Sequence, residues 1–255
     1  GTIICDIPVV IIPTAQFART PRLWLETIHR HRGTITYAPN FGYELAAKRV
    51  KDKDLESLDL SCIRVAGCGA EPIRAKSLAA FADRLAPAGF DGDKAYLPSY
   101  GMAESTLAIT FHELGTPILV DRVDPAAMKA GKATPSDADE ALELVSCGVP
   151  FEGHDLAIMD DDGRPLEERD VGEIVIRGPS VTAGYFENEE ATRAAFRDGW
   201  LRTGDLGYRA DGRVYICGRV KDLIIINGAN HHPQDIEWRV GDLPGVRPGN
   251  VVAFS

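Results

Sequence analysis

Few features of this chain mark a membrane protein, a nucleic-acid binder or a metalloprotein. Its longest apolar runs, at residues 7–12 and 223–226, have the length of strands and are far too short to span a bilayer. The net charge is −10, and no basic run in the sequence offers contacts to nucleic-acid phosphates. His231 and His232 are adjacent, so their rings rarely reach one ion, and no third ligand lies nearby. We therefore expect no membrane span, no nucleic-acid binding and no histidine metal centre.

The sequence also lacks a disulfide framework and a serine-hydrolase motif. Its five cysteines are odd in number and have no metal-ligand spacing, which is typical of reduced thiols in a core. No signal peptide precedes the first apolar run, and a Gly-x-Ser-x-Gly element is absent. With 44% apolar and 26% charged residues, the composition is that of a globular protein, and we expect a cytoplasmic location.

Two stretches far apart in the chain carry the groups that a nucleotide site needs. The first is SYGMAES at residues 99–105, and the second runs from TGDLG at 203–207 to GRVKD at 218–222. The ring of Tyr100 is suited to stack on a base, and the carboxylate of Asp205 can accept both ribose hydroxyls. The guanidinium of Arg219 would donate to the same ribose. Each has an ordinary alternative: a buried tyrosine, a turn-capping aspartate and a solvent-exposed arginine.

Phosphoryl chemistry beside such a site needs a hard cation. Glu104 offers the oxygen ligand that Mg²⁺ prefers near a triphosphate, and its alternative is a solvated surface glutamate. Ala103 has no hydroxyl to donate to an α-phosphate, and Ser105 or a backbone amide is the candidate replacement. The predicted catalytic residues are therefore Glu104, as the Mg²⁺ ligand, and Ser105.

The order, types and approximate spacing of these segments resemble the adenylate-forming superfamily. That superfamily includes acyl-CoA synthetases, luciferases and the adenylation domains of peptide synthetases. Three features resemble its fatty acyl-AMP ligase branch: Ala103 in place of a threonine, the run LPSYGMAE at 97–104, and APNFGY at 38–43. The resemblance extends over nearly the whole chain.

The resemblance implies roles for further residues. GAEP at 69–72 is similar to the loop beside the adenine, which implies nucleotide contacts for residues of this loop and of the SYGMAES motif; these are Gly69, Ala70, Glu71, Gly101 and Met102. Taken alone, the same loop is an ordinary strand-to-helix turn. Asn40 and Phe41 match the entrance of the acyl pocket, where a core phenylalanine is the alternative. Lys221 falls at the hinge between the large domain and a C-terminal lid.

The function that the resemblance implies is adenylation of a long-chain fatty acid by ATP with Mg²⁺. The acyl group of the acyl-AMP then passes to the phosphopantetheine thiol of an acyl carrier protein. A fatty acyl-CoA synthetase, which uses coenzyme A instead, is the alternative within the same class of ligase. A non-catalytic nucleotide-binding or interaction module is the alternative from another class.

Two parts of such an enzyme have no counterpart in the sequence. A Gly/Ser/Thr-rich phosphate loop closed by a lysine is absent, because AGKAT at 130–134 has no upstream glycine scaffold. The family's catalytic lysine belongs to a lid of which only the start follows Lys221. We therefore interpret the chain as a fragment and expect it to be inactive by itself, since each lost donor costs about 10²–10³ in rate.

Alternating strand-like and helix-like segments predict an α/β fold, with a layered sheet-and-helix core, a small β-rich subdomain and the start of an α+β lid domain. Strands are predicted at residues 9–12, 35–37, 62–66, 156–159 and 173–176, and two Asp-Gly pairs predict hairpin turns. The predicted divisions are 1–112 (second half of the large adenylation domain), 113–142 (an insertion or mobile segment), 143–219 (β-rich subdomain) and 220–255 (hinge and start of the lid). The resemblance implies that the segment 113–142 restrains the lid.

Overall fold

The computed structural model describes residues 2–246 and 250–254 of the chain. Contacts within the chain group it into two compact units. Unit 1 comprises Gly1–Gly67, Lys76–Tyr96 and Leu114–Pro117, and unit 2 comprises Cys68–Ala75, Leu97–Glu113 and Ile118–Ser255. The mixture of helices and sheets confirms the predicted α/β class, whereas the four predicted divisions stay predictions.

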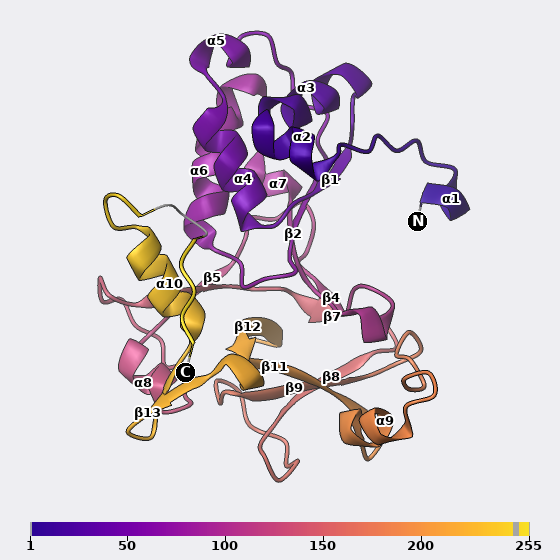
Figure 1. Ribbon diagram of the computed structural model, residues 1–255, viewed down its shortest axis with the longest axis vertical. Helices are drawn as coiled ribbons and strands as arrows, with labels where there is room; N and C mark the ends of the chain where they lie inside the picture. The colour runs from indigo at the N-terminus through magenta and orange to yellow at the C-terminus, as the bar shows by residue number, and fades with distance from the viewer. Residues whose placement is uncertain (1, 247–249, 255) are drawn as a thin grey trace. The chain divides into compact units, whose positions relative to one another are not determined.

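Unit 1 is mostly helical and contains one parallel strand pair (Figure 1). In that pair, β1 (Ile35–Tyr37) runs beside β2 (Val65–Cys68), with Ile35 opposite Val65 and Tyr37 opposite Gly67. Its helices are α1 (Thr2–Cys5), α2 (Thr14–Arg19), α3 (Arg22–His31), α4 (Asn40–Arg49), α5 (Asp52–Leu55), α6 (Ala75–Leu85), η1 (Ala86–Ala88) and α7 (Gly92–Ala95).

An aromatic cluster forms the core of unit 1. The Tyr43 and Phe81 rings meet edge to face with centroids 4.9 Å apart, and both rings also contact Trp24. The polar ends of the cluster are satisfied, because the Tyr43 hydroxyl donates to the Gly67 carbonyl and the Trp24 indole donates to Thr36 Oγ1. Helices α3, α4 and α6 thus pack against one another through large rings, and the polar atoms of Trp24 and Tyr43 keep hydrogen-bond partners.

One predicted strand in unit 1 is wrong. Residues 9–12 form no strand, and Val9, Val10 and Ile11 are exposed at 61%, 49% and 82%. An apolar run becomes a strand only where a neighbouring strand takes up its backbone hydrogen bonds, and no described strand lies alongside this one. The strand at 35–37 is confirmed, and the strand predicted at 62–66 begins later, at Val65.

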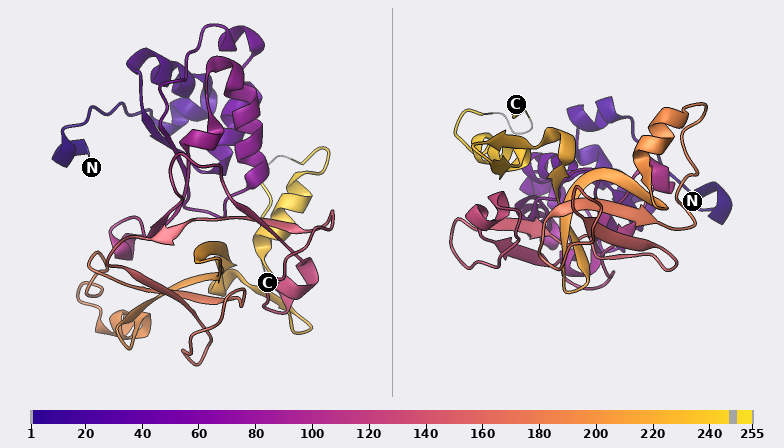
Figure 2. Two further views of the ribbon diagram at one scale, coloured as in Figure 1. Left: turned by 180° about the vertical axis from the view of Figure 1, so that it is seen from behind. Right: turned by 90° about the horizontal axis from the view of Figure 1, so that it is seen from below.

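Unit 2 is dominated by an antiparallel sheet, which Figure 2 shows from two further sides. Its strands run in the order β10 (Phe196–Arg197), β11 (Trp200–Ala210), β9 (Gly172–Arg177), β8 (Asp155–Met159), and β12 (Arg213–Arg219) also pairs with β11. The turn between β11 and β12 is Asp211-Gly212, with φ of 51° and 73° at its two residues. This confirms the hairpin predicted there, because such a turn needs positive φ at both central positions.

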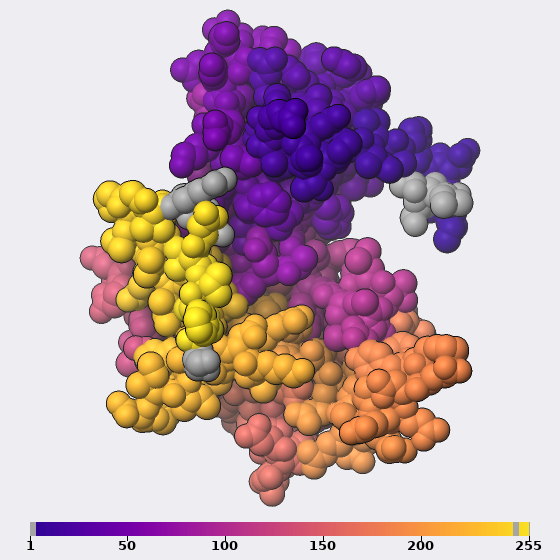
Figure 3. Space-filling model, in the orientation of Figure 1, coloured from indigo at the N-terminus to yellow at the C-terminus, as the bar shows by residue number. Residues whose placement is uncertain are grey.

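Unit 2 also contains several smaller elements. Strand β3 (Tyr96–Tyr100) pairs antiparallel with β4 (Thr110–Phe111), which pairs with β7 (Val149–Pro150). The turn η2 (Ala103–Ser105) connects β3 to β4, and α9 (Glu189–Ala195) precedes β10. After β12 come η3 (Val220–Asp222), the hairpin β13 (Ile224–Ile226) and β14 (Ala229–His231), and α10 (Pro233–Gly241). The segment with α10 is yellow in Figure 3 and lies at the surface of the face shown.

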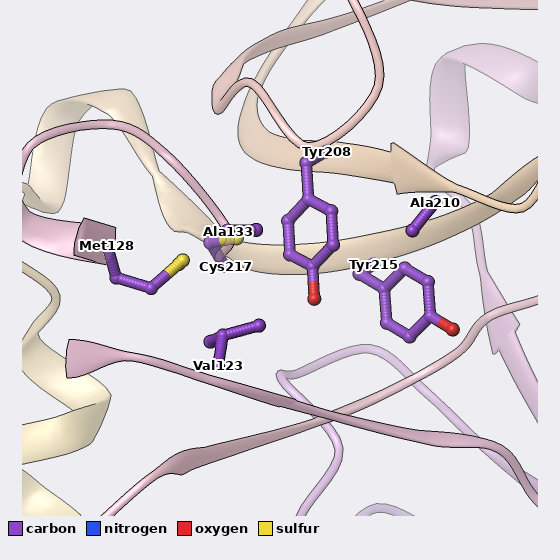
Figure 4. Close-up of a cluster of buried hydrophobic side chains, with 7 residues drawn as sticks. All are labelled: Val123, Met128, Ala133, Tyr208, Ala210, Tyr215 and Cys217. Atoms are coloured by element: carbon purple, nitrogen blue, oxygen red, sulfur yellow. The ribbon is translucent and has the colours of Figure 1, made fainter. Parts of the chain in front are cut away.

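The segment 113–142 contributes to the core of unit 2. It contains β5 (Val120–Val123) and α8 (Pro125–Lys129), and β5 pairs antiparallel with β6 (Leu142–Val145). Figure 4 shows its buried side chains in one cluster with side chains of β11 and β12; the members are Val123, Met128, Ala133, Tyr208, Ala210, Tyr215 and Cys217. Its interpretation as an insertion that restrains the lid stays a prediction.

Helix α10 carries a partly buried acid, Asp235, which yields a prediction about stability. Burial raises the pKa of Asp235 to about 6, although Arg239 and Lys129 act in the opposite direction. The pKa of this carboxyl is higher in the folded protein than in the unfolded chain. Its contribution to stability is therefore fully present below about pH 4 and is lost as pH rises through about 6. We expect Asp235→Asn to increase the free energy of unfolding at pH 8 by about 1–3 kcal/mol, with the gain shrinking towards pH 4.

Urea denaturation of both proteins at several pH values between 8 and 4.5 measures this difference. The exposed Asp137 supplies a control, because Asp137→Asn should leave stability unchanged throughout the range. A gain for Asp235→Asn that does not depend on pH would contradict the assignment, since packing alone would then explain it.

Candidate functional site

Asp205 is held in place by the edges of three paired strands. It lies on β11 directly opposite Arg219 of β12. Its own amide donates to Thr203 Oγ1 at 3.1 Å, while that hydroxyl donates to the Ile174 carbonyl of β9 at 2.7 Å. Gly204 has a φ of 71°, a conformation that glycine adopts without steric cost. The Thr-Gly-Asp sequence is therefore a local kink that directs one carboxylate off the strand.

Tyr100 and Arg219, which are predicted to contact the base and the ribose, both bind the carboxylate of Asp205. The Tyr100 hydroxyl donates to Asp205 Oδ2 at 2.7 Å, and Arg219 Nε donates to Asp205 Oδ1 at 3.1 Å. A carboxylate oxygen has two lone pairs, so each oxygen keeps the capacity to accept one more hydrogen bond. The sequence indicated these residue types, and the structure brings them together; their contacts with a nucleotide stay a prediction.

Burial sets the electrostatics of this group. Asp205 is only 7% exposed, and burial raises its pKa, while the hydrogen bond from Tyr100 and the charge of Arg219 lower it. Burial also raises the pKa of Tyr100 well above its usual value, and the charge of Asp205 adds to that shift. The Tyr100 proton therefore stays on its oxygen and serves as a hydrogen-bond donor. Because the Arg219 side chain is 67% exposed, water screens its charge, and Tyr100 is the more constant partner.

Two glycines bring backbone segments close to Tyr100. A Cβ on Gly101 would lie 1.9 Å from the Leu107 carbonyl oxygen, so no side chain fits there. A Cβ on Gly69 would lie 2.6 Å from the carbonyl oxygen of Ser99, the residue before Tyr100. The predicted adenine-side loop thus begins against strand β3. Its next residue, Ala70, has a φ of 70°, and Ala70 and Glu71 are exposed.

Glu104 lies on the short turn η2 and is partly exposed. Its Oε1 accepts a hydrogen bond from the Tyr185 hydroxyl at 2.8 Å, and no other bond to its carboxylate is found among the described residues. Among the residues that the structure describes, no cluster of three or more His, Cys, Asp or Glu is suited to hold a metal. One carboxylate with an open oxygen nevertheless fits Mg²⁺, which is commonly bound through one or two carboxylates together with substrate phosphates and water.

The structure places the remaining predicted residues as follows. The Ser105 hydroxyl is buried and lies 3.0 Å from Ser180 Oγ, whereas Met102 is partly exposed. Lys221 is exposed on η3, directly after β12. In unit 1, Asn40 is buried at the start of α4, and Phe41 is 52% exposed with its ring 6.4 Å from that of Phe17. The roles of these residues stay predictions.

Sequence reasoning missed Thr203, Tyr185 and Ser180. Thr203 stands inside the TGDLG motif, so its place next to Asp205 could have indicated a role. Tyr185 and Ser180 lie about 80 residues from their partners in loops, and no local pattern links them to the SYGMAES motif. No described helix combines the length and apolar character that crossing a bilayer requires.

Comparison with known proteins identifies the family of this chain. The model of the AMP-binding enzyme family matches residues 1–186. The chain belongs to the AMP-binding enzyme family. This confirms the resemblance stated from the motifs; Tyr100 lies within the matched residues, whereas Asp205 and Arg219 follow them.

Relatives within the AMP-binding family are similar along nearly the whole chain. A protein of Caulobacter vibrioides, provisionally named an acyl-CoA synthetase, is 44% identical over 98% of this chain and 45% of its own length. The medium-chain-fatty-acid–[acyl-carrier-protein] ligase JamA of Moorena producens is 36% identical over 98% of this chain and 44% of its own length. The chain thus spans somewhat less than half the length of these relatives.

A solved structure shares the fold. It comes from a study of fatty acyl-adenylate ligases from E. coli and L. pneumophila, and it is 44% identical to this chain with a TM-score of 0.90. The match covers 94% of this chain and 44% of the solved chain. The predicted layered core with a β-rich subdomain is therefore the architecture of this part of an AMP-binding enzyme.

Proposed function

We propose that this chain is part of a ligase that activates a fatty acid by adenylation with ATP. The observation that carries the proposal is the meeting of Tyr100, Asp205 and Arg219 at one carboxylate, in a chain similar to fatty acid ligases over nearly its whole length. That carboxylate is suited to accept from ribose hydroxyls, and Tyr100 and Arg219 orient it. An AMP moiety is the ligand that these groups fit.

In the proposed reaction, a fatty acid carboxylate oxygen attacks the α-phosphorus of ATP. The bond from that phosphorus to the bridging oxygen of the β-phosphate breaks, and pyrophosphate leaves with its electron pair. Mg²⁺, when bound at Glu104, would neutralise charge on the phosphates. The chain's own residues hold the ribose and orient the nucleotide, so catalysis rests on positioning and no covalent enzyme intermediate is needed.

The proposed acceptor of the acyl group is the phosphopantetheine thiol of an acyl carrier protein. The name of JamA, a carrier-protein ligase, supports this acceptor. The name of the Caulobacter vibrioides relative supports coenzyme A as the second candidate. The segment 113–142 bears on this choice, because it packs α8 beside β14 at the start of the proposed lid. We propose that this packing restrains the lid and favours the carrier protein.

Exchange of labelled pyrophosphate into ATP by the full-length gene product tests the adenylation. We expect exchange with medium- or long-chain fatty acids, because the reaction is reversible at the acyl-adenylate. Transfer is then compared with phosphopantetheine-loaded carrier protein and with coenzyme A. Acyl-carrier product without acyl-CoA supports the proposal, robust acyl-CoA formation supports the second candidate, and no exchange with any fatty acid overturns the adenylation itself.

A further inference from the structure

A loop segment after strand β9 reaches back to the turn that carries Glu104. This segment, residues 180–185, is here named the clamp segment. In Figure 3 the surface of the residues around 105, in magenta, adjoins the orange surface of the residues around 185. The clamp segment contacts three consecutive residues of the turn, Glu104, Ser105 and Thr106.

The clamp segment holds the backbone of the turn. The Thr182 amide donates to the Glu104 carbonyl at 2.7 Å, and Thr106 Oγ1 donates to the Ser180 carbonyl at 3.3 Å. The Ser105 and Ser180 hydroxyl oxygens are 3.0 Å apart, with Ser105 only 1% exposed. The Ser105 hydroxyl is therefore directed towards Ser180 inside the protein, and its geometry suits anchoring of the turn rather than contact with a phosphate.

Ser180 is in turn fixed by His154. His154 Nε2 is 2.7 Å from Ser180 Oγ, and Nδ1 is 3.3 Å from the Glu152 carbonyl oxygen. With Nδ1 donating to that carbonyl, Nε2 accepts from Ser180, and Ser180 Oγ can accept from Ser105. A Cβ on Gly178 would lie 2.3 Å from the His154 ring, so the ring occupies a place that only a glycine leaves open.

The turn contains a strained backbone conformation, and the contacts described above hold it in place. Thr106 has φ of 64° and ψ of −54°, and the Leu107 amide donates to the Ser105 carbonyl at 2.7 Å. This is a γ-turn of the rare, strained type, and it is centred on a β-branched residue. Such a conformation costs about 1–3 kcal/mol and persists only where the surroundings hold it. The clamp segment supplies that hold through Thr106 itself and the two residues before it.

The clamp segment also fixes the carboxylate itself. The Tyr185 hydroxyl donates to Glu104 Oε1 at 2.8 Å. One oxygen of Glu104 is thereby oriented, which leaves Oε2 to face a ligand.

We propose that Tyr185 and Ser180 are positioning residues for Glu104, fixing its carboxylate and its turn so that one oxygen is presented to the metal of a bound nucleotide. This inference rests on the proposed function. It reassigns Ser105 from phosphate contact to anchoring through Ser180. Because each residue acts through Glu104 or Ser105, its removal should matter only while that partner is present.

The contact at the carboxylate is tested first, without any activity. Urea denaturation of the 255-residue chain compares Tyr185→Phe, Glu104→Ala and the double variant. We expect Tyr185→Phe to lower the free energy of unfolding while Glu104 is present and to have little effect once Glu104 is alanine, because the hydrogen bond between them is then already lost. Losses from the two substitutions that simply add overturn the inference.

The positioning role is tested in the full-length gene product. We expect Tyr185→Phe and Ser180→Ala each to lower kcat/KM for pyrophosphate exchange about tenfold and to raise the Mg²⁺ concentration needed for half-maximal rate. Ser180→Thr, which keeps a hydroxyl, should restore most of the rate. Adding Ser180→Ala to Ser105→Ala should cause little further loss. The partly exposed Ser136 supplies the matched control, because Ser136→Ala also removes a hydroxyl that takes part in a hydrogen bond, but one outside this network.

These outcomes separate the inference from the proposed function. A Tyr185–Glu104 pair that is coupled in stability, together with wild-type rate and Mg²⁺ dependence in both Tyr185→Phe and Ser180→Ala, overturns the positioning role. Equal loss in rate without any change in Mg²⁺ dependence also overturns it, since a merely structural defect behaves in that way. Absence of exchange in the wild-type protein, with Tyr185 and Glu104 coupled in stability as expected, overturns the proposed function and leaves the contact established.

Discussion

Asp205→Ala is expected to weaken AMP binding about tenfold or more, and Arg219→Lys is expected to weaken it less. Loss of the carboxylate removes both proposed acceptors of the ribose hydroxyls, and hydrogen bonds to charged groups contribute roughly 1.5–3 kcal/mol each. Lysine keeps a positive charge and a donor opposite Asp205, although it loses the fork geometry of arginine. The Arg219 side chain is also 67% exposed, so water screens its charge and reduces its contribution to AMP affinity. Isothermal titration calorimetry with AMP measures both variants.

The same substitution leaves a buried group without its partner, so folding must be measured as well. Asp205→Ala removes the acceptor of the Tyr100 hydroxyl, and Tyr100 is only 8% exposed. Asp205→Asn keeps one acceptor for that hydroxyl and separates loss of charge from loss of structure. Circular dichroism melting identifies variants that remain folded. Equal AMP affinity of wild type and a folded Asp205→Ala would falsify the assignment of Asp205 to the ribose.

Gly101→Ala should be strongly destabilising. The added Cβ would lie 1.9 Å from the Leu107 carbonyl oxygen and 2.7 Å from the Ala108 Cα, and both are backbone atoms that cannot rotate away. Relief requires a shift of β3 against the segment after the strained turn, and overpacking of this kind costs on the order of 3 kcal/mol. Urea denaturation should show the loss, and AMP affinity should fall with it because Tyr100 adjoins Gly101.

Gly241→Ala is the matched control for this substitution. An added Cβ there meets nothing within 4 Å, and the residue has no positive φ. Its stability should therefore equal or slightly exceed that of the wild type, because alanine favours the helical conformation. A Gly101→Ala protein as stable as the Gly241→Ala protein would show that β3 and the following turn are not packed as described.

Local patterns predicted several elements of the fold well. The Asp-Gly pair at 211–212 determines a hairpin because its residues tolerate positive φ, and β11 and β12 meet there as expected. The alternating and apolar runs near 156–159 and 173–176 became β8 and β9. The run at 9–12 carries the same local signal and formed no strand, because a strand also needs a neighbour, which periodicity does not encode.

The sequence by itself determined which chemical groups were available and where turns would expose them. Tyr100, Asp205 and Arg219 were recognisable by residue type, by flanking glycines and by the order of their motifs. Only the tertiary structure decided their partners: Tyr100 meets Asp205 across 105 residues of chain, and Tyr185 meets Glu104 across 81. It also turned the Ser105 hydroxyl inward to Ser180. The reason is that local residue preferences act over a few residues, whereas contacts between distant segments depend on strand register and packing of the whole unit.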